Sequence, residues 1–184
     1  ILVIGIAGRM GKTIAECIED IKGVELGGGT EHAGSSVIGQ DIGEVAGIGI
    51  KGISVVDDPA IALETCDVAI DFTTPDSSML TLNAAVKSSK PLVVGTTGFS
   101  KEQKKEITEI GRKTCVVVAP NMSIGVNVLF KLVAEAAHVL GDDYDVEIVE
   151  AHHKFKKDAP SGTAVRISEI VADSLGRDLE EVGV

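Results

Sequence analysis

Two adjacent histidines and three lysines lie close together in residues 150–164, which read EAHHKFKKDAPSGTA. The side chains that can carry a positive charge there are His152, His153, Lys154, Lys156 and Lys157. The chain has 184 residues and a formal net charge of -11, so this segment places a local positive field in an acidic protein. Such a field favours an anionic ligand. The alternative is a pair of surface histidines beside a solvated lysine run.

Directly after these cations, Pro160-Ser161-Gly162-Thr163 precedes a helical pattern of apolar residues. The N–H groups in the first turn of a helix have no partner within the helix, and they suit an anion. Two hydroxyls and a glycine favour a carboxylate or a phosphate there, so residues 150–164 have the features of an active site. Glu147 and Glu150 are interpreted as holding the cations or facing solvent rather than as catalysts.

A second candidate site begins the chain, where apolar residues 1–4 run into GIAGRMG at 5–11 and then into a helical pattern. After a buried strand, glycines permit a tight turn and let the backbone approach a pyrophosphate, whose charge rests on the helix N-terminus. The spacing GxxGxxG departs from the GxGxxG of dinucleotide-binding loops. The alternative is that Gly5, Gly8 and Gly11 only permit close helix packing.

Glu31 strengthens the dinucleotide interpretation, because it ends the second predicted strand about 20 residues after the glycine loop. An acid at this place accepts hydrogen bonds from the adenosine ribose and favours NADH over NADPH. Arg9 and His32 offer positive charge to a 2′-phosphate, so NADPH stays open as well.

Three loops that follow predicted strands contain small residues and hydroxyls, at 71–75, 95–99 and 119–123. Ligands of open α/β sheets bind beyond the carboxyl ends of the strands. These loops leave room for a flat ring and offer backbone hydrogen bonds to an amide such as nicotinamide. For the threonines, helix capping is the alternative, and Asp76 and Ser100 are interpreted as ordinary first-turn or capping residues.

Short Val/Ile-rich runs alternate with helical patterns along the chain, which predicts an α/β fold with a Rossmann-type, doubly wound parallel sheet. Residues 34–52 are rich in glycine and are predicted to form a long surface loop. The predicted strands are residues 1–6, 24–30, 54–56, 68–72, 91–95, 115–119 and 146–150, and the predicted helices are 9–21, 59–63, 75–87, 101–113 and 125–140.

We expect two domains, a dinucleotide-binding domain at residues 1–120 and an incomplete α+β domain for substrate binding and oligomerisation at 121–184. The second domain has one clear strand, 146–150, which needs partners that the visible sequence does not supply. The chain begins without Met and stops after a helical pattern, so we expect both ends to be truncated.

Composition excludes several classes of partner. The acidic balance argues against nucleic acid. No apolar run approaches the roughly 20 residues that span a bilayer, and no signal peptide precedes the first strand, so we expect a cytoplasmic protein with no membrane partner. Cys17, Cys66 and Cys115 are interpreted as buried, reduced thiols. No cluster has the spacing of a metal site, so no metal is predicted.

Four motifs taken together, GxxGRMG, GTTGF, APNMSIGVN and EAHHKFKKDAPSGTA, make the chain similar to the dihydrodipicolinate reductase family, also called 4-hydroxy-tetrahydrodipicolinate reductases. The resemblance extends over essentially the whole chain. It implies an enzyme of the diaminopimelate route to lysine that reduces a cyclic dicarboxylate to tetrahydrodipicolinate with NADH or NADPH. It also implies a substrate domain whose mixed sheet assembles a homotetramer.

The same resemblance implies roles for particular residues. Substrate contacts fall on His153, Gly162 and Thr163, and proton transfer falls on His152 and Lys156. Some members have an arginine after the ribose acid where this chain has His32, which leaves the choice of nucleotide open. Cofactor contacts fall on Gly5, Ile6, Ala7, Gly8, Arg9, Met10, Glu31, His32, Gly95, Thr96, Thr97, Ala119, Pro120, Asn121 and Met122.

Hydride transfer to an imine-like ring leaves electron density on a neighbouring carbon, which must then be protonated. His152 can give that proton near neutral pH, and Lys156 can stabilise the negative charge or give the proton itself, so both roles stay open. Two other functions stay open on the fold alone, a non-catalytic NAD-binding regulatory protein and another Rossmann dehydrogenase. The His/Lys cluster counts against the regulatory protein, because sensing does not need it.

Overall fold

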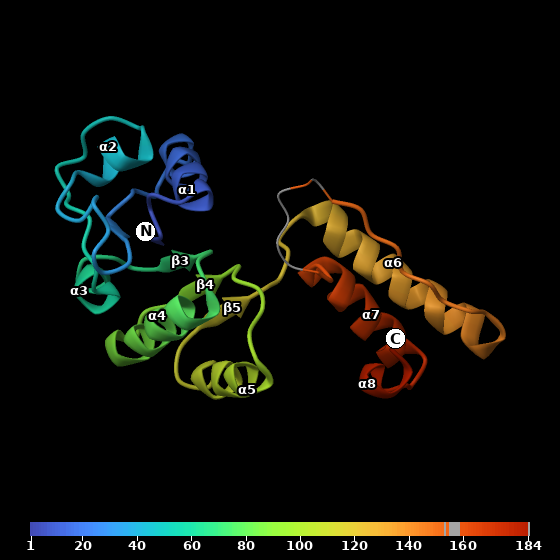
Figure 1. Cartoon of the computed structure of the whole chain (residues 1–184). Helices are drawn as coiled ribbons and strands as arrows, with labels where there is room; N and C mark the ends of the chain where they lie inside the picture. The colour runs from blue at the N-terminus through green and yellow to red at the C-terminus, as the bar shows by residue number, and fades with distance from the viewer. Residues whose placement is uncertain (153, 155–158, 184) are drawn as a thin grey trace. The chain divides into compact units, whose positions relative to one another are not determined.

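The computed structural model describes residues 1–152, 154 and 159–183. The chain divides into two compact units, Ile1–Ala119 and Pro120–Val184, and Figure 1 colours both along the chain.

The first unit is built on one sheet of five parallel strands in the order β2-β1-β3-β4-β5. Non-consecutive neighbours in this order require helical crossovers, so the predicted α/β fold with a parallel, Rossmann-type sheet is confirmed. The strands are β1 (Leu2–Ile4), β2 (Gly28–Thr30), β3 (Ala69–Asp71), β4 (Leu92–Val94) and β5 (Val116–Val118).

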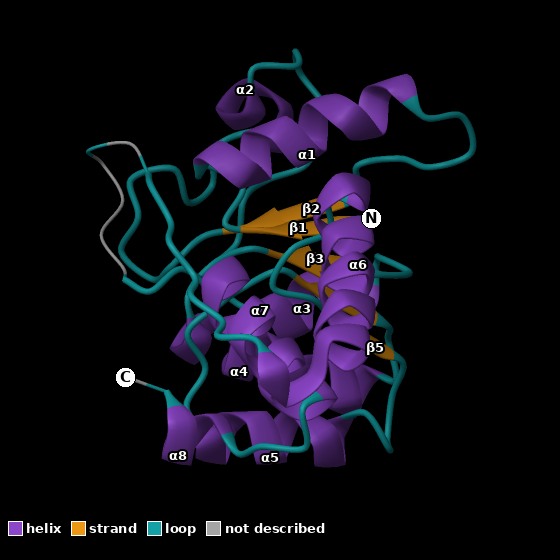
Figure 2. Cartoon of the chain, turned by 90° about the vertical axis from the view of Figure 1, so that its right-hand side faces the viewer, coloured by secondary structure: helices purple, strands orange, loops and turns teal. Residues whose placement is uncertain are grey.

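Helices cover both faces of this sheet (Figure 2). The helices are α1 (Arg9–Asp20), α2 (Ile42–Ala46), α3 (Pro59–Glu64), α4 (Pro75–Ser88) and α5 (Lys101–Ile110). Side chains alternate along a strand, so β1 serves two separate cores. Leu2 and Ile4 pack with residues of α3 and α4, whereas Val3 packs with residues of α1 and α2. All three are at most 5% exposed, which explains why β1 reads as a continuous apolar run.

Polar side chains cap the first turns of two helices of this unit. The Ser100 side chain accepts from the Gln103 backbone N–H, and the Gln103 side chain accepts from the Ser100 N–H, which forms a capping box at the start of α5. The interpretation of Ser100 as a capping residue is confirmed. Asp58 caps the start of α3, where its side chain accepts from the Ala60 N–H at 2.8 Å.

The segment 34–52 contains a buried helix, so its prediction as a surface loop is wrong. Ile42 is 0% exposed, and it packs with Val45 and Ala46 in the core that also holds Val3. A helix of five residues gives too few turns for a 3.6-residue periodicity to show in the sequence. The glycines around it dominate the local composition instead.

The second unit contains α6 (Ile124–Leu140), the short 3-10 helix η1 (Gly141–Asp143), α7 (Gly162–Ser174) and α8 (Leu179–Val182). α6 and α7 pack against each other. The predicted strand at 146–150 is wrong for this structure, because these residues form no ladder with any described residue. An isolated extended segment has no partner to satisfy its backbone groups, so apolar alternation alone does not make it a strand.

Apolar side chains of α6 are unusually exposed. Ile124 is 83% exposed, Leu132 62% and Val139 71%. By length and composition, Ile124–Asp143 is sufficient to cross a membrane. The expectation that no apolar run approaches this length is therefore wrong for α6, although helices that pack against other protein surfaces have the same composition.

The three cysteines are all free, but only Cys66 is buried. The interpretation of Cys17 and Cys115 as buried thiols is wrong. Cys17 lies off the face of α1 that buries Gly11, Ala15 and Ile18. Cys115 precedes β5, the edge strand, where burial is incomplete.

Candidate active site

A cavity of about 680 Å³ lies at the carboxyl ends of β1, β2 and β3, where ligands of such sheets bind. Its walls combine the glycine loop, the residues after β2, the loop after β3 and the first turns of α4. The lining residues are Ile4, Gly5, Gly8, Arg9, Met10, Gly11, Thr30, Glu31, His32, Ala33, Asp57, Pro59, Phe72, Thr73, Thr74, Asp76, Ser77, Leu80 and Thr81.

In the glycine loop, the start of α1 lies so close to the preceding turn that Gly11 cannot be replaced by a residue with a Cβ. A Cβ on Gly11 would lie 2.1 Å from the Gly5 carbonyl oxygen, and Gly5 has a φ of +71°. α1 starts at Arg9 with no acidic residue in its first turn and no side-chain cap from Gly8. Its first N–H groups can therefore receive an anion, with the helix dipole in the favourable sense.

Glu31 is tied directly to this loop. Its Oε1 accepts from the Ala7 N–H at 3.1 Å, and its Oε2 accepts from the His32 N–H at 3.3 Å. The carboxylate is partly buried and keeps acceptor capacity toward the cavity that it lines. His32 is exposed beside it, with Nδ1 at 3.1 Å from the Ala33 carbonyl. The two residues that the sequence assigns to the ribose and its 2′ position thus share one wall with Arg9.

A buried polar chain joins the loops after β3 and β4. Asp71 is 0% exposed, and its Oδ1 accepts from the Thr73 N–H at 2.9 Å and from the Thr73 hydroxyl at 2.6 Å. The Thr96 hydroxyl donates to the same oxygen at 3.5 Å, and the Ser78 hydroxyl donates to Thr96 at 2.7 Å. Asp71 Oδ2 is buried with no hydrogen-bond partner among the described residues. The predicted loops 71–75 and 95–99 are therefore held by one carboxylate.

Some predicted cofactor residues do not line the cavity. Ile6 is buried in the core, Thr96 belongs to the polar chain, and a Cβ on Gly95 would lie 2.0 Å from the Phe72 ring. Thr97 is exposed outside the cavity lining, as is Met122 in the second unit. Asn121 also lies in the second unit, where its Nδ2 donates to the Thr163 hydroxyl at 3.3 Å. Ala119 and Pro120 stand where the first unit ends and the second begins.

Several residues that line the cavity were not singled out as binding residues from the sequence. Asp76 was interpreted as a first-turn residue, yet it lines the cavity and accepts from Gln103 Nε2 at 3.2 Å. Ser77, Leu80 and Thr81 follow it on α4, and Asp57 precedes α3. The sequence feature that could have identified the residues of α4 is their position directly after a strand-end loop. A helix that starts there turns its first residues toward the space where ligands of such sheets bind.

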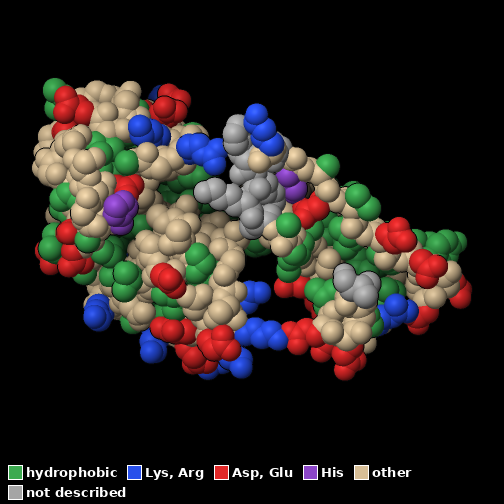
Figure 3. Space-filling model, in the orientation of Figure 1, with side chains coloured by type: hydrophobic (Ala, Val, Ile, Leu, Met, Phe, Trp, Pro, Cys, Tyr) green, Lys and Arg blue, Asp and Glu red, His purple; other side chains and the backbone are tan. Residues whose placement is uncertain are grey.

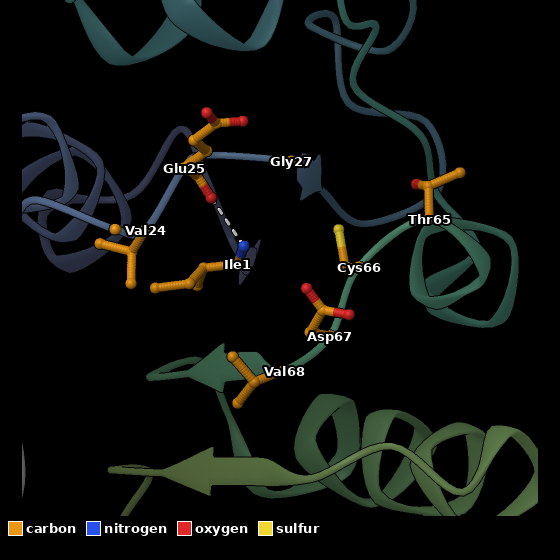
Figure 4. Close-up of a pocket in the computed structure, with 9 residues that line it drawn as sticks. Ile1, Val24, Glu25, Gly27, Thr65, Cys66, Asp67 and Val68 are labelled. Carbon is orange, nitrogen blue, oxygen red and sulfur yellow. Dashed lines mark hydrogen bonds between the residues drawn. The ribbon is translucent and has the colours of Figure 1, made fainter.

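A second cavity of about 420 Å³ lies at the opposite edge of the sheet, where the strands begin (Figure 4). Residues beside Ile1 and Cys66 line it, and the Ile1 amino group donates to the Glu25 carbonyl at 2.7 Å. This edge is not where ligands of parallel sheets bind, and it offers no glycine loop at a helix start. The candidate site is therefore the larger cavity.

In the second unit, one carboxylate joins the histidine segment to the start of α7. Glu150 Oε1 accepts from the Ser161 N–H at 2.8 Å, and Glu150 Oε2 lies 2.8 Å from His152 Nε2. Hydrogen bonds from the Ser161 side chain and backbone, followed by that of His152, lower the pKa of Glu150 to about 2. Glu150 therefore contacts His152 and Ser161 at once, and its expected role in holding the cations stays a prediction.

The start of α7 has the form of an anion site. Ser161 is the N-cap, 5% exposed, and its hydroxyl accepts from the Ala164 N–H at 3.1 Å. The first turn holds no acidic residue, and the N–H groups of Gly162 and Thr163 have no acceptor among the described residues. His153, Lys156 and Lys157 lie outside the described residues, so the roles expected of His153 and Lys156 stay predictions.

Charge on the molecule follows the composition. On the face shown in Figure 3, Asp and Glu side chains lie on both units, in keeping with the net charge of -11. Among the residues that the structure describes, no group of three or more His, Cys, Asp or Glu side chains is placed to hold a metal ion.

Two family models match this chain. The model for the N-terminus of dihydrodipicolinate reductase matches residues 1–122, and the model for its C-terminus matches residues 125–184. Among curated relatives, the 4-hydroxy-tetrahydrodipicolinate reductase of Hahella chejuensis is 50% identical over 184 residues, which is 100% of this chain and 69% of the relative. That of Geotalea uraniireducens is 50% identical over 182 residues, 99% of this chain and 68% of the relative.

Solved structures agree with these relatives. Dipicolinate-bound dihydrodipicolinate reductase from a Paenisporosarcina species superposes with a TM-score of 0.68 at 28% identity, covering 94% of this chain and 65% of that one. An amine dehydrogenase from Mycobacterium smegmatis superposes with a TM-score of 0.53 at 25% identity, covering 64% of this chain and 37% of the dehydrogenase. This chain thus spans about two thirds of the length of the reductases that it matches. The predicted fold, enzyme class and function are confirmed, and the chain belongs to the dihydrodipicolinate reductase family, the oxidoreductases that act on 4-hydroxy-tetrahydrodipicolinate in lysine biosynthesis.

Proposed function

We propose that residues 1–120 bind NADH or NADPH and that residues 121–184 bind the cyclic dicarboxylate 4-hydroxy-tetrahydrodipicolinate. The observation that carries the proposal is the cavity at the sheet's carboxyl edge, where an uncapped helix start and the Glu31 carboxylate face one space. The nucleotide supplies the hydride when it is bound.

The residues present fit a dinucleotide. Gly11 lets α1 start close against the loop, because a Cβ there would clash with the Gly5 carbonyl, and the first N–H groups of α1 receive the pyrophosphate. Glu31 accepts from the ribose hydroxyls while its bond to Ala7 fixes it against the loop. The exposed side chains of Arg9 and His32 give a 2′-phosphate favourable partners, so both nucleotides bind and Glu31 favours NADH.

The substrate is held by charge and by the start of α7. One carboxylate of the ring accepts hydrogen bonds from the backbone N–H groups of Gly162 and Thr163. The Asn121 side chain orients the hydroxyl of Thr163. His152 gives a proton to the ring carbon that carries electron density after hydride transfer, because a histidine titrates near neutral pH. His153 contacts the substrate, and Lys156 stabilises the negative charge. The solved relative bound to dipicolinate supports this class of ligand.

Absorbance at the reduced nicotinamide band tests the proposal. The protein is mixed with NADH or NADPH, and the dihydrodipicolinate precursor is then added, freshly made by its synthase. We expect the absorbance to decay in proportion to the enzyme added. Nucleotide binding with no decay would instead support a regulatory protein that binds the nucleotide without turnover.

The protein also assembles as a homotetramer in this proposal. Exposed apolar side chains along α6 support an assembly, because contiguous apolar surface marks a protein interface more often than a free surface.

A further inference from the structure

A single carboxylate touches both parts of the proposed substrate site. Glu150 Oε1 receives the N–H of Ser161, and Glu150 Oε2 lies 2.8 Å from Nε2 of His152. Ser161 is the residue that caps α7, so its backbone position fixes where the N–H groups of Gly162 and Thr163 point. The proton donor and the carboxylate clamp are therefore connected through one side chain.

This contact determines which ring nitrogen of His152 carries a proton. Glu150 has a pKa of about 2, so at neutral pH it is ionised and can only accept hydrogen bonds. The partner nitrogen, Nε2, must then be the donor in both the charged and the neutral ring. The nitrogen that loses its proton when the ring becomes neutral is Nδ1.

The contact contributes little to folding stability. The side chains of His152 and Glu150 are 39% and 28% exposed, and ion pairs this accessible to solvent are worth little. Each Glu150 oxygen nevertheless contacts a group of the same site, Oε1 the Ser161 N–H and Oε2 the His152 ring. The effect of this geometry is to orient the His152 ring, just as a buried aspartate orients the histidine of a catalytic triad.

We propose that Glu150 is a positioning residue for the reduction, which holds the His152 ring with its proton on Nε2 and aligns it with the start of α7. The proposal rests on the proposed function, because it takes His152 as the proton donor. In the step itself, the Nδ1–H bond of the imidazolium breaks and a C–H bond forms at the ring carbon. The neutral ring keeps its Nε2 proton against Glu150, and solvent restores the proton on Nδ1.

Glu150→Gln tests the proposal, because it keeps the shape and removes the charge. The amide can still accept from Ser161, but its NH₂ group donates to His152, which forces Nε2 to accept and places the proton on Nδ1. We expect kcat to fall about 10- to 100-fold, a part of what general acid catalysis contributes. KM for the nucleotide should not change. The matched control is Glu147→Gln, an exposed carboxylate of the same segment, which should leave kcat unchanged.

A spectroscopic readout separates positioning from a structural effect. Two-bond correlation spectra of the protein labelled with ¹⁵N-histidine, at about pH 9 where histidines are neutral, distinguish the two ring tautomers. The His152 signals are assigned by their loss in His152→Gln. We expect the Nε2–H form in the parent and in Glu147→Gln, and the Nδ1–H form in Glu150→Gln. Glu150→Asp, which keeps an acceptor, should retain more of the Nε2–H form and more activity than Glu150→Gln.

Each outcome has one meaning. An unchanged tautomer in Glu150→Gln, or turnover at the parent rate, overturns the positioning role. If Glu150→Gln does not fold, Glu150→Asp decides, since a parent-like rate with a displaced tautomer also overturns it. Full turnover in His152→Gln would overturn the proton-donor role of the proposed function, while a tautomer switch in Glu150→Gln would still establish the Glu150–His152 contact.

Discussion

At the scale of single residues, we expect Glu31 to determine how the two nucleotides compete. Its carboxylate is fixed by the Ala7 N–H and lines the cavity, so we expect it to accept from the ribose hydroxyls of NADH and to meet the 2′-phosphate of NADPH as a like charge. Hydrogen bonds to a charged group are worth about 1.5–3 kcal/mol, which sets the size of the effect.

Glu31→Ala should therefore weaken NADH binding by on the order of 10- to 100-fold and NADPH binding by clearly less. Nucleotide fluorescence titration measures both affinities. Glu16→Ala, which removes an exposed carboxylate from α1, is the control and should leave them unchanged. An equal loss for both nucleotides would count against the ribose role of Glu31.

At the scale of elements, Asp71 links the ends of β3 and β4. The buried chain Ser78, Thr96, Asp71 and Thr73 crosses from α4 to two strand-end loops. Asp71→Ala leaves the donors of Thr73 and Thr96 without an acceptor, which costs about 1–3 kcal/mol in the free energy of unfolding. Nucleotide affinity should also fall, because Thr73 lines the cavity. Urea unfolding and titration measure the two effects, and Asp67→Ala, an exposed change before the same strand, should cause neither.

Asp41 organises the segment that the sequence predicts as a loop. Its carboxylate accepts from the backbone N–H groups of Gly43, Glu44, Lys51 and Gly52. The hydrogen bond from Lys51 is the largest cause that lowers its pKa. Since the folded pKa lies below the unfolded one, this stabilisation is present above the unfolded pKa and is lost as pH falls through the folded pKa.

Asp41→Asn should therefore lower stability at neutral pH, and the difference from the parent should shrink as the pH falls below about 4. Thermal unfolding monitored by circular dichroism at several pH values measures this. Glu44→Gln, an exposed carboxylate in the same helix, is the matched control. A difference that stays constant down to acid pH would contradict the role of the Asp41 charge.

At the scale of the whole molecule, the exposed face of α6 should govern assembly. Ile124, Val128 and Leu132 recur every four residues along one side of the helix, and each is more than half exposed. Leu132→Lys should lower the molar mass measured by light scattering, whereas Lys131→Ala, on the same helix, should not. An unchanged mass in Leu132→Lys would place the contact elsewhere, and a monomeric parent would contradict the tetramer.

The sequence predicts those parts of the molecule that leave a pattern in consecutive residues. Buried parallel strands read as apolar runs, and the glycine loop reads as a strand followed by a helix start, so the sheet and the glycine loop at its carboxyl edge were predictable. The short helix α2 and the lack of a strand partner for 146–150 among the described residues were not, because five residues carry no periodicity and strand pairing needs a partner. The contacts of Asp71 with Thr96 and of Glu150 with Ser161 join separate segments, so no local pattern contains them.

Because Gly11 lies close to the Gly5 carbonyl, the positions of the proposed nucleotide site differ in how readily they accept substitutions. Even a methyl group at position 11 would push α1 away from the loop, so that position accepts no stepwise change. Glu31 and His32 follow β2 instead, and single substitutions of these side chains alter the charge that faces the cavity. A lineage that needs a different nicotinamide nucleotide can therefore change the strand end and inherit the loop intact.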